Sequence, residues 1–174
     1  HLVLSPGIEF VPPPAGNWNP ELTPHAWQAG DQTTLLKNQL AAMRSDDLFV
    51  MTVPKSPYRC PPGPYERACV VADYLKRKGR IGAKVIVLDA NDKIQAEPEA
   101  FTHAFNVTHA GYIEYYPNAT VQSVNSTTRS IVTSVKTVNN AKVLNYIPNQ
   151  KAGVIAAGLP LNSSGYVPVN PLTY

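Results

Sequence analysis

The chain has 174 residues, of which 44% are hydrophobic and 16% are charged, so it can bury one core and is too apolar to be disordered. Its net charge of +3 comes without a long basic run, which argues against a nucleic-acid-binding surface. Its apolar runs are far shorter than the roughly 20 residues of a membrane span. We therefore expect a globular domain that binds no nucleic acid and does not span a membrane.

The N-terminal part predicts a loosely built entry to this domain. "HLVLSPG" (1–7) predicts a short strand and a turn, and "IEFVPPPAGNWNPELTP" (8–24) predicts an irregular connection because it is rich in proline. Apolar residues then recur at helical spacing, which predicts a helix over roughly 27–43. Since the chain opens without Met inside an apolar run, we expect it to be a piece of a longer protein.

The middle of the chain alternates strands and helices. "DDLFVMTVP" (46–54) predicts a buried strand, and "GPYERACVVADYLKRKG" (63–79) predicts a helix that Gly79 caps. "AKVIVLDAN" (83–91) is a continuous apolar run, typical of a parallel strand buried on both faces. "PEAFTHAFNVTHAG" (98–111) predicts a short helix.

The remaining segments predict strands, the middle two with alternating β-branched residues. They are "YIEYYP" (112–117), "TVQSVNS" (120–126), "SIVTSVKTV" (130–138) and "AKVLNYIP" (141–148). The order strand–helix–strand–helix–strand followed by further strands predicts an α/β fold. We expect a Rossmann-like domain of the NAD-binding type, with a parallel sheet and a small antiparallel β addition. We divide the chain into 1–47, with a Pro-rich linker and connecting helix, and the Rossmann-like domain at 48–174.

An unusual loop joins the first buried strand to its helix. A dinucleotide-binding fold keeps its glycine-rich phosphate loop at this place. Here the run "SPYRCPPGP" (56–64) contains four prolines, which remove N–H donors. Bulky Tyr58, Arg59 and Tyr65 occupy the approach. We infer that the domain keeps the dinucleotide-binding topology but does not hold NAD(P) in the usual way.

The loop places Cys60 at the start of a helix. The helix N-terminus and the neighbouring Arg59 both favour a thiolate, and Glu66 in the first turn is close enough to exchange a proton. The alternative, that Cys60 is a small buried hydrophobic residue in a rigid turn, stays open. Cys69 is expected to face the sheet in the core. Helix geometry puts the two cysteines beyond disulfide reach, and they share no zinc-ligand spacing with the four histidines.

The string "RCPPGPYERA" (59–68) resembles the flavoprotein subunit of flavocytochrome c sulfide dehydrogenase. This family lies within the sulfide:quinone and pyridine-nucleotide disulfide reductase superfamily. The resemblance covers nearly the whole chain and is weakest over 111–140. Further similar segments are "LVLSPGIEF", "PHAWQAGDQTTLLKNQL", "AKVIVLDAN" and "NYIPNQKAGVIAAGLPLNSSGYVPVN".

The resemblance implies a periplasmic oxidoreductase. Such subunits carry FAD and a redox-active disulfide that sulfide attacks, and the electrons pass through the flavin to a cytochrome c subunit. Cys60 matches one cysteine of that disulfide, and Glu66 matches an acid that assists proton transfer. Ser5, Pro6 and Gly7 match a turn near the cofactor, so 1–47 would include the end of a flavin-domain segment.

The sequence also departs from the family pattern. It has no Gly-x-Gly-x-x-Gly motif for FAD and no match to the second redox cysteine. We therefore expect an excised central domain that packs on the flavin domain of its parent, holds no FAD by itself and is inactive alone. Two alternatives stay open: a non-catalytic interaction domain of the same fold, and a relative that passes electrons to quinone.

Overall fold

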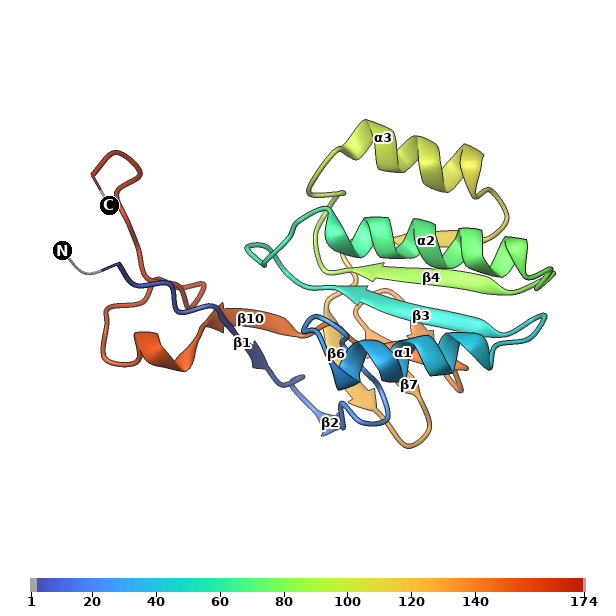
Figure 1. Ribbon diagram of the computed structural model, residues 1–174, viewed down its shortest axis with the longest axis horizontal. Helices are drawn as coiled ribbons and strands as arrows, with labels where there is room; N and C mark the ends of the chain where they lie inside the picture. Colours follow the sequence, from blue (N-terminus) through green and yellow to red (C-terminus); the bar gives the residue numbers. More distant parts are fainter. Residues whose placement is uncertain (1–2, 174) are drawn as a thin grey trace.

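The computed structural model describes residues 3–173. Its centre is a four-stranded parallel sheet with the strand order β5-β4-β3-β9 (Figure 1). Helix α2 connects β3 to β4, and α3, continued by the π-helix η1, connects β4 to β5. The predicted α/β, Rossmann-like fold with a parallel sheet is confirmed. The bounds are β3 Leu48–Val53, α2 Gly63–Arg77, β4 Lys84–Asp89, α3 Pro98–His103, η1 Ala104–Thr108, β5 Ile113–Tyr116 and β9 Val143–Asn145.

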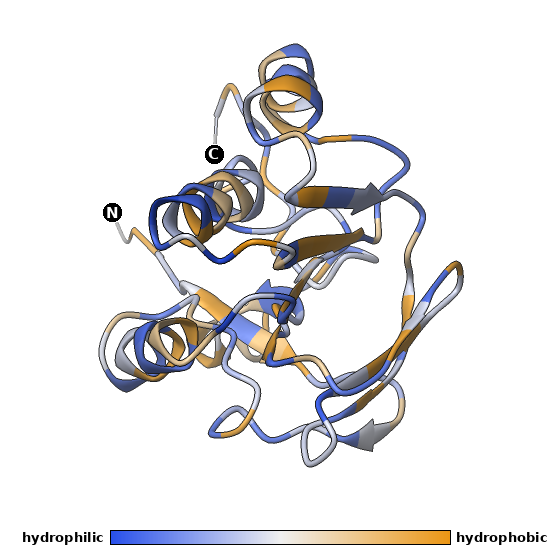
Figure 2. Cartoon of the chain, turned by 90° about the vertical axis from the view of Figure 1, so that its right-hand side faces the viewer, coloured by the Kyte–Doolittle hydropathy of each residue, from blue (hydrophilic) through white to orange (hydrophobic). Residues whose placement is uncertain are grey.

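The parallel sheet is covered on both faces. Alternate residues of one strand point to opposite faces, so Phe49 and Met51 pack with the helices while Val50 packs on a second sheet. Figure 2 shows the helices on one side of the parallel strands and the second sheet on the other. The second sheet has the order β2-β6-β7-β8 and is the predicted small β addition. Its strands are β2 Gly16–Asn17, β6 Val121–Asn125, β7 Ser130–Thr133 and β8 Thr137–Val138.

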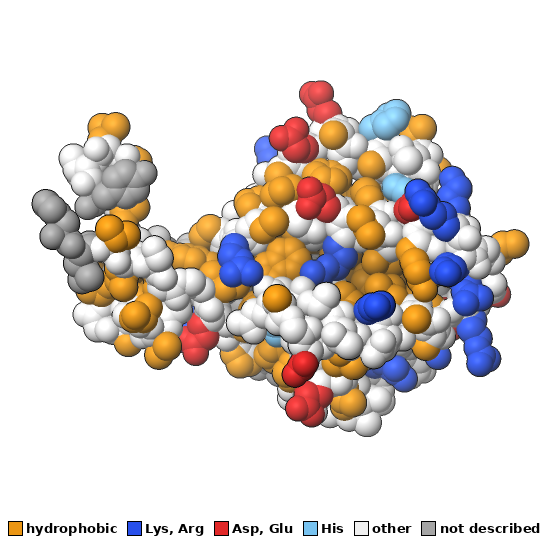
Figure 3. Space-filling view, in the orientation of Figure 1, with side chains coloured by type: hydrophobic (Ala, Val, Ile, Leu, Met, Phe, Trp, Pro, Cys, Tyr) orange, Lys and Arg blue, Asp and Glu red, His pale blue; other side chains and the backbone are white. Residues whose placement is uncertain are grey.

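A two-stranded antiparallel ribbon projects from this body. It pairs β1 (Ile8–Val11) with β10 (Asn149–Ala152), and both ends of the described chain lie beyond it (Figure 1). The short 3₁₀ helix η2 (Val154–Ala156) follows β10. Hydrophobic side chains gather on this projection (Figure 3). Its exposed large apolar residues include Val3, Val154, Ile155, Leu161, Val169 and Leu172.

Several predicted elements near the N-terminus differ from the structure. The irregular connection predicted for 8–24 is wrong over β1 and β2, which pair with strands more than 100 residues away. No strand occurs over residues 3–7, and residues 1–2 of that predicted strand lie outside the described part. Helix α1 covers only Asp31–Ala41, because Gly30, with φ +98°, precedes it and Trp27 is buried by packing outside the helix.

The later elements agree with the predictions except at one turn and at β10 and η2, for which the sequence predicts no element. A turn after Thr133 divides the predicted strand 130–138 into β7 and β8, because the Thr133 hydroxyl and N–H both bond the Lys136 carbonyl. Gly79, with φ +63°, ends α2, and the Arg80 N–H donates to the Leu75 carbonyl at 2.9 Å, so the predicted glycine cap is confirmed. The domain division at residue 47 stays a prediction.

Candidate active site at the Pro-Cys loop

The Pro-Cys loop, residues 56–62, is held in place by hydrogen bonds as well as by its prolines. The Tyr58 hydroxyl donates to the Pro61 carbonyl at 2.9 Å, within the loop itself. The Arg59 N–H donates to Gln150 Oε1 at 2.8 Å, and the indole N–H of Trp27 donates to the Arg59 carbonyl at 3.2 Å. These bonds tie the loop to the ribbon on one side and to the segment before α1 on the other.

Cys60 lies at the outermost turn of this loop. Its thiol is free and exposed, and its φ of +61° lies in the left-handed region that side chains other than glycine rarely adopt. The Gly63 N–H donates to the Cys60 carbonyl at 3.0 Å, and α2 starts at Gly63. The turn therefore holds the sulfur beside the first turn of the helix, as the sequence predicted.

A hollow of about 390 Å³ opens beside Cys60. It lies between the start of α2 and the segment before α1. A methyl group on Gly63 would come within 2.9 Å of both Cys60 Sγ and the Trp27 ring, so only glycine lets the sulfur and the indole approach the helix this closely. The lining includes Ala26, Trp27, Ala29, Cys60, Glu66 and Arg67. The structure thus brings Cys60 and Glu66 to one hollow.

Arg67 is the residue in this hollow that the sequence reasoning missed. Its Nη1 donates to the His25 carbonyl at 2.8 Å and to Asn145 Oδ1 at 3.0 Å, and its Nη2 donates to the Ala26 carbonyl at 2.6 Å. Its Cζ lies 4.8 Å from the centre of the Trp27 ring, a cation–π distance. Burial lowers the pKa of Arg67 to about 10, and the Cys60 thiolate acts in the opposite direction. The guanidinium is therefore charged at neutral pH.

A buried hydrogen-bond network centred on the Asp89 carboxylate lies next to the start of α2, close to the Pro-Cys loop. Asp89, fully buried at the end of β4, accepts hydrogen bonds from the Tyr65 hydroxyl at 2.7 Å and the Tyr115 hydroxyl at 2.9 Å. The Asn91 backbone and side-chain amides also donate to it, each at 2.8 Å. Burial raises the pKa of Asp89 in spite of these bonds, and it raises the pKa of both tyrosines. In a dinucleotide-binding fold, an acidic residue at the end of this strand binds the ribose. In this chain the Asp89 carboxylate is hydrogen-bonded to Tyr65 and Tyr115 instead.

The turn predicted to lie near a cofactor sits on the ribbon side of the loop. Ser5 is exposed, and the Gly7 carbonyl accepts a bond from the Gly153 N–H at 3.1 Å. The Pro6 carbonyl lies against Gly153, where a methyl group would come within 2.0 Å of its oxygen. Gly7 and Arg59 line one hollow of about 340 Å³ with Tyr166. The structure thus brings Gly7 next to the Pro-Cys loop.

This second hollow offers a limited fit to a flavin. The buried Tyr166 hydroxyl has no hydrogen-bond partner within residues 3–173, and open space lies where a side chain on Gly7 would stand. A planar ring would therefore contact the backbone at Gly7, whereas the enclosed Tyr166 hydroxyl is not accessible from the hollow. These residues suit one edge of a flavin ring, and nothing among them resembles a phosphate-binding loop.

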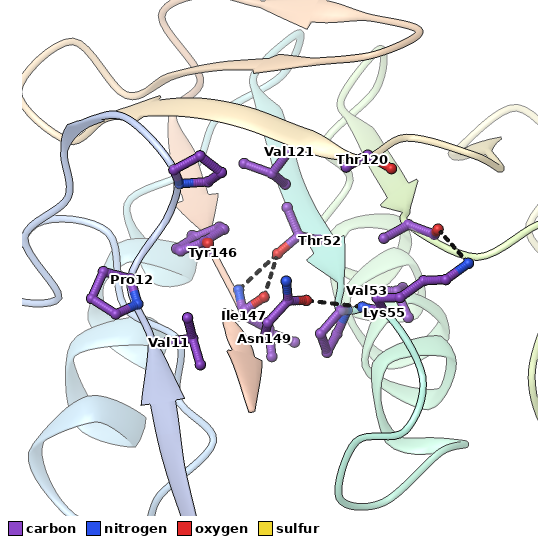
Figure 4. A pocket seen from close by; sticks show the side chains of 13 residues that line it. Val11, Pro12, Thr52, Val53, Lys55, Thr120, Val121, Tyr146, Ile147 and Asn149 are labelled. Carbon is purple, nitrogen blue, oxygen red and sulfur yellow. Dashed lines mark hydrogen bonds between the residues drawn. The ribbon is translucent and has the colours of Figure 1, made fainter. Parts of the chain in front are cut away.

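A third hollow, of about 530 Å³, lies at the carboxyl ends of β3 and β9 (Figure 4). Rossmann-like folds bind ligands at this edge of the sheet. Here the Thr52 hydroxyl donates to the Ile147 carbonyl at 2.9 Å and accepts from the Ile147 N–H at 2.8 Å. Asn149 Oδ1 accepts from the Lys55 N–H at 3.0 Å. Most of the remaining wall is apolar, so the hollow is poorly suited to phosphate groups.

Within residues 3–173, no helix has both the length and the apolar character needed to cross a membrane. Within the same part of the chain, His, Cys, Asp and Glu side chains form no group of three or more suited to a metal ion.

The fold and the loop together define a Rossmann-like domain in which an exposed cysteine stands where a nucleotide phosphate would bind. Residues 33–148 match the family described as the central part of the sulfide dehydrogenase (flavocytochrome c) flavoprotein chain. The chain belongs to this family, so it is the central domain of an oxidoreductase flavoprotein, and the resemblance noted on "RCPPGPYERA" is confirmed.

Proposed function

We propose that this domain supplies Cys60 as one sulfur of a redox-active disulfide in a flavoprotein that oxidises sulfide and passes electrons to cytochrome c. The observation that carries the proposal is the exposed Cys60 thiol, held by an anchored turn and sharing a hollow with Glu66 and Arg67. The second cysteine, the FAD-binding domain and the cytochrome c subunit belong to the parent complex, which we place in the periplasm.

The chemistry assigned to Cys60 is thiol–disulfide exchange. A hydrosulfide ion attacks the partner cysteine's sulfur and forms a new S–S bond there. The old S–S bond breaks, and Cys60 leaves as a thiolate with the bonding electron pair. One S–S bond is thereby exchanged for another: the Cys60 sulfur is reduced to a thiolate, and the sulfide sulfur is oxidised to the outer sulfur of a persulfide on the partner cysteine.

Glu66 and the helix support this step. The Glu66 carboxylate is exposed at the edge of the hollow, where it can accept the proton that hydrogen sulfide loses on entering as hydrosulfide. The N-terminus of α2 stabilises the negative charge on the departing Cys60 sulfur. Gly7 would contact one edge of the flavin. When bound, FAD supplies a two-electron acceptor that can release electrons singly to a cytochrome c.

The test is sulfide-dependent reduction of cytochrome c by the parent flavoprotein, followed by absorbance. Cys60→Ser should lower the rate at least about 1,000-fold, because no disulfide can form. Cys69→Ser, a matched control in the same helix region, should stay within about threefold. Sulfide oxidation that survives Cys60→Ser in the presence of bound flavin would refute the assignment.

A further inference from the structure

The hollow beside Cys60 contains a cation that lacks a neutralising partner. Within residues 3–173 the ion pairs are Arg77 with Asp73 and Lys151 with Glu9, so neither involves Arg67. All three hydrogen-bond acceptors of Arg67 within residues 3–173 are neutral: two backbone carbonyls and one amide oxygen. A partly buried cation is normally paired, because desolvation is costly. The charge of Arg67 is therefore not neutralised by an ion pair within residues 3–173.

Arg67 also keeps hydrogen-bond donors available. A guanidinium has five N–H groups, and the bonds to His25, Ala26 and Asn145 use three of them. The Nε–H and one N–H on Nη2 have no acceptor within residues 3–173. Because Arg67 lines the hollow together with Cys60, an anion beside the sulfur can accept these bonds.

The other ionisable groups around Arg67 do not cancel its charge. His25 packs beside it, and burial followed by the nearby Arg67 charge lowers the pKa of His25 to about 4, so the imidazole is neutral at neutral pH. Glu66 and Arg59 both line the exposed rim of the hollow, so their opposite charges offset each other and the charge of Arg67 remains. The Arg59 Nη2 donates to the Trp27 carbonyl at 3.0 Å.

We propose that the hollow lined by Arg67, Trp27 and Cys60 is a binding subsite for a small sulfur anion, such as hydrosulfide or a hydropolysulfide. Arg67 binds the negative end through its free N–H groups. The Trp27 ring and the neighbouring alanines contact the polarisable, weakly hydrated sulfur atoms. Resting on the proposed function, this subsite raises the local concentration of sulfide around the disulfide before the attack.

The charge selectivity of Cys60 modification can be measured in this chain without flavin. In a Cys69→Ala background, Cys60 is the only thiol, and its reaction rates with an anionic and a cationic methanethiosulfonate can be compared. The reagents are the 2-sulfonatoethyl and 2-(trimethylammonio)ethyl derivatives. We expect a ratio of anionic to cationic rates about tenfold above that of N-acetylcysteine amide. Arg67→Gln should lower the ratio about tenfold, whereas Arg67→Lys should keep it within about threefold of wild type.

Two further arginine variants serve as comparisons. Arg77→Gln removes an exposed charge at the far end of α2 and should change the ratio less than 1.5-fold. Arg59→Gln should change it at most about threefold. A larger effect from Arg59→Gln than from Arg67→Gln would overturn the assignment to Arg67.

Thiocyanate, a sulfur-terminated anion that does not reduce disulfides, tests binding directly. It should slow the reaction of Cys60 with neutral methyl methanethiosulfonate in a saturable manner, and chloride at equal ionic strength should not. This measurement needs only the wild-type chain, so it remains decisive if Arg67→Gln does not fold by circular dichroism. Equal effects of the two salts, or a wild-type rate ratio no higher than that of the model thiol, would overturn the proposal.

The subsite and the proposed function can fail separately. Charge selectivity and thiocyanate protection at Cys60, combined with full sulfide oxidation by Cys60→Ser flavoprotein, would keep the subsite and refute the disulfide role. Loss of oxidation in Cys60→Ser, with no charge selectivity at Cys60, would keep the disulfide role and refute the subsite.

Discussion

Cys60 and Cys69 lie on either side of the first turn of α2, and their surroundings differ in almost every respect. Cys60 is exposed in a left-handed turn and faces a hollow that contains an arginine. Cys69 is half-buried against the main core. Burial, followed by the negative charge of Glu66, raises the pKa of Cys69.

The difference separates a thiol placed for chemistry from one placed for packing. A cysteine reacts as its thiolate, so a nearby cation and solvent access favour reaction while burial and a nearby anion oppose it. The same carboxylate, Glu66, takes part in both environments, since it lines the Cys60 hollow and acts on the Cys69 thiol. The start of α2 thus favours one sulfur over the other.

The largest expected consequence is selective alkylation. With iodoacetamide at neutral pH, Cys60 should react on the order of 100-fold faster than Cys69, since only Cys60 is exposed and the pKa of Cys69 is raised. Mass spectrometry of timed, quenched samples would give both rates. Cys60→Ser should remove the fast reaction, and Cys69→Ser should leave it unchanged. Similar alkylation rates for the two thiols would contradict the proposed difference between Cys60 and Cys69.

Replacing each cysteine with glycine should separate their structural roles. Cys69→Gly should lower the free energy of unfolding by about 2 kcal/mol, because it puts glycine inside a helix and removes core contacts. Cys60→Gly should change it by less than about 0.5 kcal/mol, since glycine adopts a φ of +61° without strain. Urea unfolding measures both. A cost at position 60 equal to that at 69 would show that the Cys60 side chain also has a packing role.

The Asp89 network lies under the loop that carries Cys60 and should make stability depend on pH. The pKa of Asp89 is raised in the folded chain above its usual 3.8, so the folded state holds this proton more tightly than the unfolded state. The contribution of Asp89 to stability is therefore greatest below about pH 4 and falls as the pH rises through the folded pKa.

The variant Asp89→Asn removes this titration. The difference in unfolding free energy between wild type and Asp89→Asn should fall as the pH rises above 4. Urea unfolding at several pH values measures it, with Asp73→Asn, an exposed acid, as the control. A difference that grows with pH would mean that the hydrogen bonds from Tyr65 and Tyr115 outweigh burial.

Local sequence signals predicted much of this region but missed one residue, Arg67. Proline, glycine and charge patterns gave the start and end of α2, and the strand–loop–helix order placed Cys60 and Glu66 correctly. Arg59, predicted as the neighbouring cation because it adjoins Cys60 in the chain, lines the hollow, and Arg67 is a second cation there. Helical spacing places Arg67 four residues before the buried Val71, on the inward face, and this signal could have revealed it.

Contacts between distant segments could not be predicted in the same way. Trp27 meets the Pro-Cys loop from the segment before α1, and β1 pairs with β10 across most of the chain. Such pairings depend on tertiary packing, which helical spacing and turn residues do not predict. For this reason the Pro-rich entry was predicted as irregular, and the indole wall of the Cys60 hollow was not foreseen.

The smallest expected effect tests whether Glu66 connects the two cysteines. Because the charge of Glu66 is the second cause of the raised pKa of Cys69, Glu66→Gln in a Cys60→Ser background should increase Cys69 alkylation about two- to threefold at pH 8. Asp73→Asn is the matched control: this acid lies on the same helix but is paired with Arg77 at 2.7 Å, so its removal should change the rate less. Equal acceleration by both variants would show that Cys69 responds only to the total charge of α2. Acceleration by Glu66→Gln alone would mean that this one carboxylate keeps Cys69 protonated. The same carboxylate also lines the hollow of Cys60.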